Sequence, residues 1–442
     1  MNGMGVRDVY KAKESAPSFT VKTKIPLQKK KRKKKRELKM SGIAERWKVL
    51  SGSDKWEGLL DPLDSDLCRY LIHYATMVGP ASEAFINEPA SKYVGLSRYA
   101  RGNLLAKSGV VKGNPFKYEV TKYFYAPSTI EVPDDGYTVR PARADAVLKE
   151  SNWIGYVAVA TDEGKVALGR RDILIAWRGT KRPSEWKSNF TFVFVKAPLF
   201  FGQDSDPQVH KGWYDMYTTI NQDSQLNQKS ARDQIREEAA RLVELYKDEE
   251  ISITVTGHSL GSSMATLNAT DLAFNPINNN KDILVTAFLY ASPKVGDGNF
   301  KNAISNQQNL RVLRISDVND IVTAVPPIGW PDGSLVQLKP YVDVGEGIEI
   351  ESKKSQYLKP GINNLLTHDL MLYMHGIDGF QGSKGGFERQ GYFDLAKVNK
   401  YQGALEKEYP TPTGWLGIKD NGMVQQEDGT YILDDHEPDE TF

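Results

Sequence analysis

The chain has 442 residues, of which 40% are hydrophobic and 26% charged, a balance typical of a globular protein with enough chain to bury a full core. A single cysteine, Cys68, excludes a disulfide scaffold and a zinc site built from cysteines alone. The formal net charge is +1, but residues 1–40 hold 14 Lys+Arg against 3 Asp+Glu. A basic arm of net charge +11 therefore precedes a body of net charge −10.

The arm contains eight consecutive basic residues, Lys29 to Arg36. Such a run repels itself and cannot bury an apolar face, so we expect residues 1–40 to form a basic disordered arm. The run is typical of a nuclear-import signal or of an electrostatic contact with anionic lipid or nucleic acid, and it is equally compatible with a dispensable leader.

The distribution of apolar residues bears on the cellular location of the protein. Residues 1–28 hold no apolar stretch of the kind that a secretory leader requires, and no run reaches the roughly 18 apolar residues of a membrane span. Together with the lone Cys68, these observations predict a cytoplasmic protein. The nucleus or a peripheral position on an anionic membrane, reached through the basic arm, is the alternative.

The first part of the body, residues 41–150, is predicted to be helical. Apolar residues recur at helical spacing over 43–100, most clearly in Leu67–Val78. From Ser151 the pattern changes to short apolar runs between turn signals, which are typical of strands. These runs are 153–160, 173–177, 251–255, 283–290 and 311–315. Continuous apolar runs favour strands that are buried on both faces, as in a mostly parallel sheet.

A long helix separates two of these runs. Ser230 followed by Asp233 resembles a capping box, and apolar residues recur on one helix face from Ile235 to Tyr246. Strands separated by helices predict an α/β fold with a mostly parallel central sheet flanked by helices. The end of the chain differs, because Asp420 to Phe442 hold eight acidic residues and no Lys or Arg. We therefore expect 416–442 to be a loose acidic tail.

The motif that carries chemistry follows the run 251–255 directly and reads Gly257-His258-Ser259-Leu260-Gly261. A G-x-S-x-G pattern between a β-branched strand and a helix is typical of a serine nucleophile on a sharp turn. Bulky residues two before or two after the serine would clash, which is the physical reason for both glycines. The helix cannot pair its first N–H groups, so the N–H of Leu260 can donate to a developing oxyanion. Taken alone, the same pattern also describes a Gly-rich turn without chemistry.

A serine nucleophile needs a histidine base and a carboxylate that orients it, and in α/β hydrolases they follow in the order Ser, Asp/Glu, His. Three histidines follow Ser259, and His436 is disfavoured because it lies in the acidic tail. His368 and His375 are seven residues apart and would share one face of a helix, so their spacing does not choose between them. In the loop after 311–315, Asp317 and Asp320 are both candidates for the acid.

The combined motifs resemble those of the class 3 (fungal-type) lipases and, more closely, the plant phospholipase A1 (type II) group. Besides Gly257–Gly261, the resemblance rests on residues 43–47, 56–64, 176–180, 209–213 and 230–234, which read IAERW, WEGLLDPLD, AWRGT, VHKGW and SARDQ. It covers most of residues 41–415 and implies an α/β-hydrolase lipase domain there, with 151–415 as the catalytic core.

The resemblance also implies a role for each motif residue. Ser259 matches the nucleophile, Asp320 the acid and His368 the base. Thr180 and Leu260 match the backbone N–H donors to the oxyanion. The chain departs from many relatives at Asp317, where an asparagine is usual. The family chemistry requires neither a metal nor an organic cofactor, so none is expected here.

The resemblance implies a serine acylhydrolase that releases the sn-1 fatty acid from phospholipids, with transient contact to a lipid surface and no need for nucleic acid. The same triad would serve a galactolipid or triacylglycerol lipase or a general carboxylesterase. A non-enzymatic alternative is a lipid-surface or nuclear binding protein with a decayed site. The apolar run Phe192–Phe201 is expected to be a lid or interfacial contact, or else a buried strand and loop.

Overall fold

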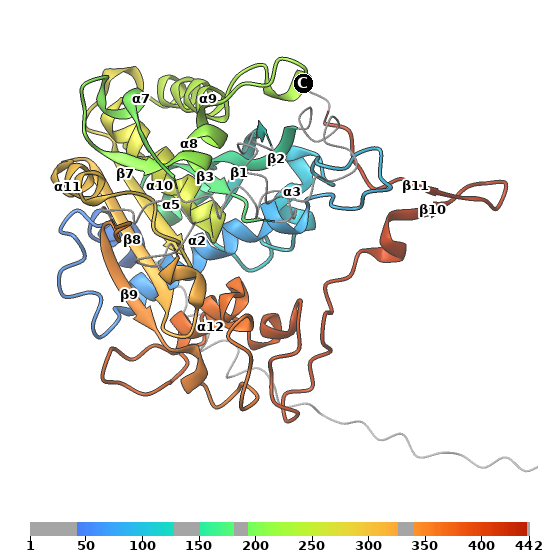
Figure 1. Cartoon of the computed structure of the whole chain (residues 1–442). Coiled ribbons are helices and arrows are strands. Elements are labelled where there is room, and N and C mark those ends of the chain that lie inside the picture. Colours follow the sequence, from blue (N-terminus) through green and yellow to red (C-terminus); the bar gives the residue numbers. More distant parts are fainter. Residues whose placement is uncertain (1–41, 128–150, 181–192, 326–339, 440–442) are drawn as a thin grey trace, which may run out of the picture. The chain divides into compact units, whose positions relative to one another are not determined.

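A computed structural model describes residues 42–127, 151–180, 193–325 and 340–439. The predicted basic arm, 1–40, lies outside the described residues. The described body is built on a seven-stranded sheet with the order β1-β2-β3-β6-β7-β8-β9 (Figure 1). Its strands are β1 (Tyr118–Pro127), β2 (Ser151–Ala160), β3 (Arg171–Trp177), β6 (Ile251–His258), β7 (Leu284–Tyr290), β8 (Leu310–Asp317) and β9 (Glu346–Ile350). The first three pair antiparallel, and β3 through β9 run parallel.

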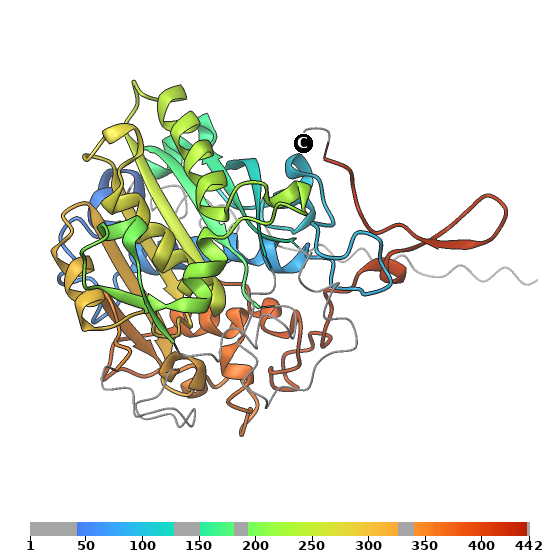
Figure 2. The same cartoon turned by 45° about the horizontal axis from the view of Figure 1, so that its top comes forward.

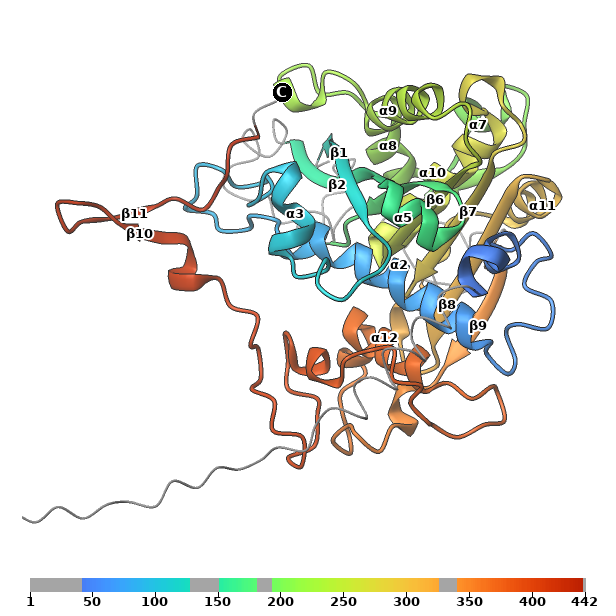
Figure 3. The same ribbon diagram turned by 180° about the vertical axis from the view of Figure 1, so that it is seen from behind.

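Side chains alternate between the two faces of the sheet, and different helices cover each face. On β7, the Tyr290 hydroxyl donates to the Leu71 carbonyl of α2 (Ser65–Glu83) at 2.6 Å, and Phe288 stacks on Tyr74 of the same helix. The α12 helix (Leu370–Gly379) packs beside α2, as the view from behind shows (Figure 3).

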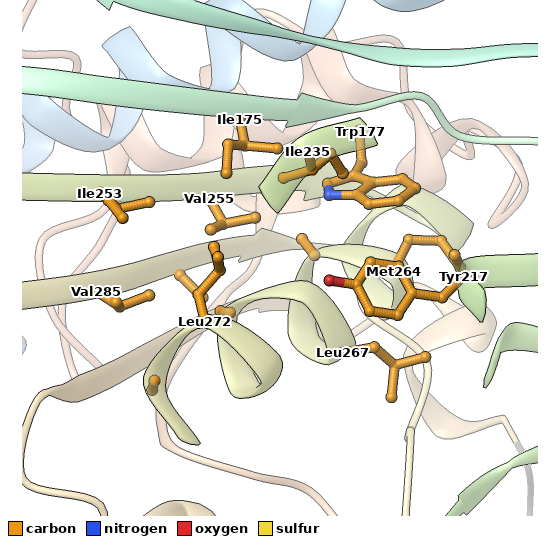
Figure 4. Packing of buried hydrophobic residues seen from close by; sticks show 14 of the residues in the cluster. Ile175, Trp177, Tyr217, Ile235, Ile253, Val255, Met264, Leu267, Leu272 and Val285 are labelled. Atoms are coloured by element: carbon orange, nitrogen blue, oxygen red, sulfur yellow. The ribbon is translucent and has the colours of Figure 1, made fainter. Parts of the chain in front are cut away.

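The opposite face carries the main hydrophobic core. It is covered by α8 (Lys211–Thr218), α9 (Ala231–Leu245), α10 (Leu260–Phe274) and α11 (Gly298–Asn306). Ile175, Ile253, Val255 and Val285 of the strands belong to this core, and Figure 4 shows them with Met264 and Leu272 of α10. The α10 helix is buried along almost its whole length, which is why its sequence carries no polar stripe.

Five strands expected after residue 151 are present as β2, β3, β6, β7 and β8. Ser230 is confirmed as the helix cap, since its hydroxyl accepts the Asp233 N–H at 3.1 Å at the start of α9. The prediction that 41–150 is helical needs one correction in the part of it that the structure describes. Helices cover 42–50, Ser65–Glu83 and Arg101–Lys107, but Tyr118–Pro127 forms the sheet-edge strand β1. Its charged residues hid this edge strand from a pattern based on apolar runs.

A buried ion pair anchors α2 to the sheet. Arg170 and Asp172 approach to 3.2 Å with both side chains fully buried. The Asp172 carboxylate accepts hydrogen bonds from Tyr74 at 2.9 Å and Tyr118 at 2.6 Å, and the Ser252 and Thr254 hydroxyls also donate to it. Because every oxygen of this carboxylate is engaged, the desolvation of the pair is offset.

The acidic end of the chain is only partly as expected. Residues 423–425 and 431–433 pair as the hairpin β10–β11, which stands away from the sheet (Figure 2). Beyond the hairpin, Asp435 is buried and accepts from the Ser91 hydroxyl at 2.7 Å, and Asp439 pairs with Arg101 at 2.6 Å. The prediction of a loose tail is therefore wrong for residues 435–439, because opposite charges hold them against 91–107.

Within the described ranges, no helix combines the length and the apolarity needed to cross a bilayer.

The buried His73 makes the stability of the fold depend on pH. His73 of α2 lies among Tyr74, Phe116 and Tyr118, and neither ring nitrogen has a hydrogen-bond partner among the described residues. Burial lowers the pKa of His73 to about 3.

The low pKa of His73 makes stability depend on pH. Below about pH 6.5 His73 is protonated in the unfolded chain, whereas in the folded chain it stays neutral down to about pH 3. The free energy of unfolding therefore falls as the pH falls through this window. We predict that His73→Phe reduces the loss of unfolding free energy between pH 7 and pH 5 by roughly 2 kcal/mol. Urea unfolding at both pH values measures this, and an unchanged difference would contradict it.

Candidate active site

Ser259 occupies a strained turn between β6 and α10. Its φ of 58° and ψ of −128° lie in a region that residues with side chains rarely adopt. The Ser259 N–H donates to the Tyr290 carbonyl at 3.0 Å, which ties the turn to the neighbouring strand β7. The Ser262 hydroxyl donates to the carbonyls of Gly257 and Tyr290 at 2.7 and 2.8 Å, and so fastens the first turn of α10 to the same place.

The two motif glycines are required by close backbone approaches. A Cβ on Gly257 would lie 2.2 Å from the Gly261 carbonyl oxygen. A Cβ on Gly261 would lie 2.6 Å from the Trp177 carbonyl oxygen at the end of β3. The steric reason expected from the sequence therefore holds, and Gly261 additionally lets α10 touch the neighbouring strand.

The structure brings together the three predicted members of the triad. The His368 Nδ1–H donates to Asp320 Oδ2 at 2.7 Å, and His368 Nε2 lies 2.9 Å from the Ser259 hydroxyl. Because the carboxylate can only accept, Nδ1 carries the proton and Nε2 is left to accept the serine proton. Ser259 and Asp320 are buried, and His368 is 18% exposed, so the base lies at the surface of the site. This arrangement can activate a hydroxyl for attack on a carbonyl carbon.

The choice between the two histidines is decided by where the helix begins. His368 ends a short 3₁₀ turn, Leu366–His368, and α12 starts only at Leu370, so the two histidines do not share a helix face. His375 is buried inside α12 and pairs with the Ser355 hydroxyl at 2.7 Å. Burial lowers its pKa to about 3. His436 donates to the Ser97 carbonyl at 2.7 Å, in the docked C-terminal segment.

The choice between the two aspartates is likewise clear. Asp317 ends β8 and supports the loop, accepting the N–H groups of Asn319 and Ser352, both at 2.9 Å. Asp320 caps the following 3₁₀ turn through the Val322 N–H at 2.9 Å and turns its other oxygen to His368. Asp317 thus shapes the loop that presents Asp320.

Tyr373 is a site residue that the sequence reasoning missed. Its hydroxyl donates to Asp320 Oδ2 at 2.7 Å and accepts the Asp317 N–H at 3.0 Å. Burial and the Asp320 charge raise the pKa of Tyr373 well above its usual value, so it remains a donor. Burial acts to raise the pKa of Asp320, but the bonds from His368 and Tyr373 outweigh it, so that its pKa lies below the usual value. Tyr373 lies five residues after His368, and only the start of α12 reveals their proximity.

The motif pattern alone predicts no role for His258. Its Nε2–H donates to the His368 backbone carbonyl at 2.7 Å, and the two rings lie 4.8 Å apart. His258, which directly precedes Ser259, therefore holds the backbone of His368.

The oxyanion donors expected from the sequence lie on adjacent segments. Trp177 pairs with Gly257 across the parallel strands β3 and β6, so the residues after them leave the sheet side by side. A Cβ on Gly179 would lie 3.0 Å from the His258 carbonyl oxygen and 3.8 Å from Ser259 Cβ. Thr180 thus follows a residue in contact with the turn Gly257–Gly261, the elbow that carries Ser259. Leu260 begins α10, where the helix cannot pair its N–H.

The aromatic run 192–201 was expected to be either a lid or a buried strand and loop. Phe192 lies outside the described residues, and 194–196 form the short strand β4, paired with β5 (Gln208–His210). In the short helix α7, Pro198–Phe201, Phe200 is buried against Tyr214. Burial in 193–201 is mixed, with Ala197 and Phe200 buried and β4 partly exposed, so whether this run is a lid or a buried strand and loop stays a prediction. Val193 and Leu199 are the large apolar side chains here that stay exposed.

The sheet order, the strand–turn–helix at Ser259 and the Asp–His–Ser geometry together define an α/β-hydrolase. Residues 174–330 match the family model described as lipase (class 3). The chain is 43% identical over 409 residues to phospholipase A1-IIalpha of Arabidopsis thaliana, covering 90% of this chain and 94% of the relative. It is 42% identical over 402 residues to phospholipase A1-II 4 of Oryza sativa subsp. japonica, covering 90% and 97%.

The chain therefore belongs to the plant phospholipase A1 (type II) group of the class 3 lipases. The family and the α/β-hydrolase fold predicted from the sequence are confirmed. In the described ranges, no group of three or more His, Cys, Asp or Glu is arranged to hold a metal ion.

We predict that Gly261→Ala disrupts the elbow. The added methyl would overlap the carbonyl groups of Trp177 and Arg178, and neither α10 nor β3 can yield without losing core packing. Thermal unfolding and labelling of the serine by a fluorophosphonate measure the effect, and labelling should slow at least tenfold. The matched control is Gly298→Ala in α11, where nothing lies within 4 Å of the added carbon. Equal behaviour of the two variants would contradict the prediction.

We predict that Tyr373→Phe lowers kcat roughly tenfold, because a hydrogen bond to a charged group is worth about 1.5–3 kcal/mol and Asp320 loses one. Steady-state hydrolysis at neutral pH tests this. Tyr156→Phe is the control, since it removes a buried hydroxyl that donates to the Met77 carbonyl, outside the triad. A kcat within twofold of the parent for Tyr373→Phe would show that Asp320 does not depend on this hydroxyl.

Proposed function

We propose that this chain hydrolyses the sn-1 acyl ester of phospholipids, with Ser259 as nucleophile, His368 as base and Asp320 as the acid. The observation that carries the proposal is the hydrogen-bonded series from Asp320 through His368 to Ser259, at 2.7 and 2.9 Å. Relatives that cover almost the whole body and are named phospholipase A1 support the choice of substrate.

Acylation begins when the Ser259 oxygen attacks the ester carbonyl carbon and its proton passes to His368 Nε2. Asp320 stabilises the imidazolium that forms. The N–H groups of Thr180 and Leu260 donate to the oxyanion of the tetrahedral intermediate. When the intermediate collapses, the ester C–O bond breaks, and His368 gives its proton to the leaving glycerol oxygen. The products of this half are a lysophospholipid and acyl-Ser259.

Deacylation repeats the same steps with water. His368 takes a proton from the water as the water oxygen attacks the acyl carbon, and the intermediate is held by the same two N–H groups. Its collapse releases the fatty acid and returns the proton to Ser259. These steps use only side chains, backbone N–H groups and water, so the proposed mechanism calls for no metal or organic cofactor. We expect the contact with the lipid surface to be transient.

We predict that Ser259→Ala reduces release of fatty acid by roughly 10⁴-fold or more, because the nucleophile is lost. The substrate is phosphatidylcholine with a different acyl chain at each position, and mass spectrometry identifies the acid released. Ser263→Ala is the matched control, since its hydroxyl lies one turn along α10 and has no hydrogen-bond partner among the described residues. It should retain the parent rate.

Other outcomes of this experiment would support a different mechanism, position of attack or substrate class. Parent-like release by Ser259→Ala would overturn the mechanism. Release of the sn-2 chain would keep the mechanism and overturn the position of attack. Faster turnover of a galactolipid, a triacylglycerol or a soluble monomeric ester would move the chain to those substrate classes. Vesicle binding without hydrolysis by the parent protein would support the non-enzymatic alternative.

A further inference from the structure

Arg178 follows β3 directly and is completely buried. Its guanidinium is fixed from several directions. Nε donates to the Trp153 carbonyl of β2 at 3.0 Å, and Cζ lies 4.0 Å from the centre of the Phe85 ring. Nη1 donates to the Gly179 carbonyl at 2.8 Å. The last of these contacts joins a buried charge to the segment beside the nucleophile.

The Gly179 carbonyl, which accepts that bond, belongs to the peptide group that joins Gly179 to Thr180. The carbonyl of Gly179 and the N–H of Thr180 are the two ends of one planar unit and point in opposite directions across a trans peptide. Thr180 is the residue proposed to donate its N–H to the oxyanion. The guanidinium of Arg178 and the developing negative charge would therefore lie at opposite ends of the same peptide.

This arrangement favours the oxyanion in two ways. A charge-assisted hydrogen bond on the carbonyl oxygen polarises the peptide, so its N–H becomes a stronger donor. The positive charge also acts directly on the oxyanion through a buried, weakly screening region. Both effects grow as the negative charge develops, so they stabilise the transition state more than the bound substrate.

The same bond fixes the orientation of the peptide. Gly179 has no side chain that would restrict rotation of the peptide after it. The close approach of the His258 carbonyl also leaves little room for a side chain at this position. Rotating the Gly179–Thr180 peptide would turn a carbonyl oxygen, in place of an N–H, toward the oxyanion. The rotated peptide would also lose its bond to Arg178, so the arginine opposes the unproductive orientation.

We propose that Arg178 is a positioning residue for oxyanion stabilisation, which holds and polarises the peptide whose N–H belongs to Thr180. The proposal rests on the proposed function, since it takes Ser259 as the nucleophile and the Thr180 N–H as a donor.

The strand β3 offers a matched control. Arg170 precedes the strand and Arg178 follows it, and both side chains are buried. Arg170 pairs with Asp172 and donates to the Ser252 hydroxyl, so its contacts lie in the anchor of α2 and not at the elbow. Replacing each arginine by lysine makes the same chemical change at the two ends of one strand. A lysine at either place keeps the charge but cannot reproduce two directed N–H bonds from one planar group.

The test compares Arg178→Lys and Arg170→Lys in the full-length protein. The measurements are kcat and KM on phosphatidylcholine, the thermal midpoint, and the inhibition constants of two probes. One probe is an alkyl trifluoromethyl ketone, which adds to the serine and forms an oxyanion. The other is a diether phospholipid, which binds but cannot be attacked.

For Arg178→Lys we expect kcat to fall about ten- to a hundredfold, since removal of a whole oxyanion donor costs about a hundred- to a thousandfold. KM and the affinity for the diether lipid should stay within twofold, and the affinity for the trifluoromethyl ketone should fall by the same factor as kcat. Arg170→Lys should lower the thermal midpoint while kcat and both affinities stay within threefold of the parent.

Two results would overturn the proposal. One is a kcat of Arg178→Lys within threefold of the parent, and the other is an equal loss of affinity for both probes. If Arg178→Lys does not fold, Phe85→Leu replaces it, because this change removes the ring beside the guanidinium and keeps the arginine. It should give the same pattern with a three- to tenfold loss of kcat, and an unchanged kcat would then overturn the proposal. A parent enzyme that fails to bind the ketone would contradict the proposed function instead.

Discussion

Ser259 is held at a positive φ between a central parallel strand and a buried helix, a conformation that costs of the order of 1–3 kcal/mol and persists only where the surroundings over-determine it. The restraints come from both sides of β6. On one side the Tyr290 carbonyl of β7 accepts the Ser259 N–H, and on the other the end of β3 packs against Gly261. Because β6 lies between two parallel partners and α10 is buried almost throughout, this turn cannot relax without disturbing the core. The strain is thus maintained by the packing of the whole sheet.

The parallel sheet also explains why the site assembles. The carboxyl ends of parallel strands meet at one edge, and β3, β6 and β8 deliver the segments that carry Thr180, Ser259 and Asp320 to that edge. His368 comes from a later turn, and its backbone is held by His258 of the elbow itself. Around this edge the structure adds buried donors, Tyr373 on the carboxylate and Arg178 on the peptide before Thr180. Both act on groups whose charge matters in the reaction, which is where a buried hydrogen bond has its largest effect.

Much of the fold could be predicted because local patterns and burial agree. Strands covered on both faces must be apolar throughout, so β2, β3, β6, β7 and β8 stand out as runs. The α9 helix is recognisable from its cap and its single apolar face. The strand β1 escaped because it lies at the sheet edge and mixes charged with aromatic residues, and the docking of Asp435 and Asp439 escaped because their partners lie more than 300 positions away. Contacts of that range leave no periodic trace in either segment.

The sequence by itself determined the family, the α/β class and the turn that carries Ser259, because a strand, a glycine turn and a helix are adjacent in the chain and the steric need for Gly257 and Gly261 is local. Residue spacing left Asp317 and Asp320, and His368 and His375, as alternatives. The family resemblance favoured Asp320 and His368, and the tertiary structure places these two in hydrogen-bonding order with Ser259. Each pair has the same chemistry within a few residues, and their roles depend on where β8 ends and where α12 begins. The surroundings of Tyr373 and Arg178 likewise depend on the tertiary structure, since the bond from Tyr373 to Asp320 and the bond from Arg178 to the Trp153 carbonyl join groups that are far apart in the chain.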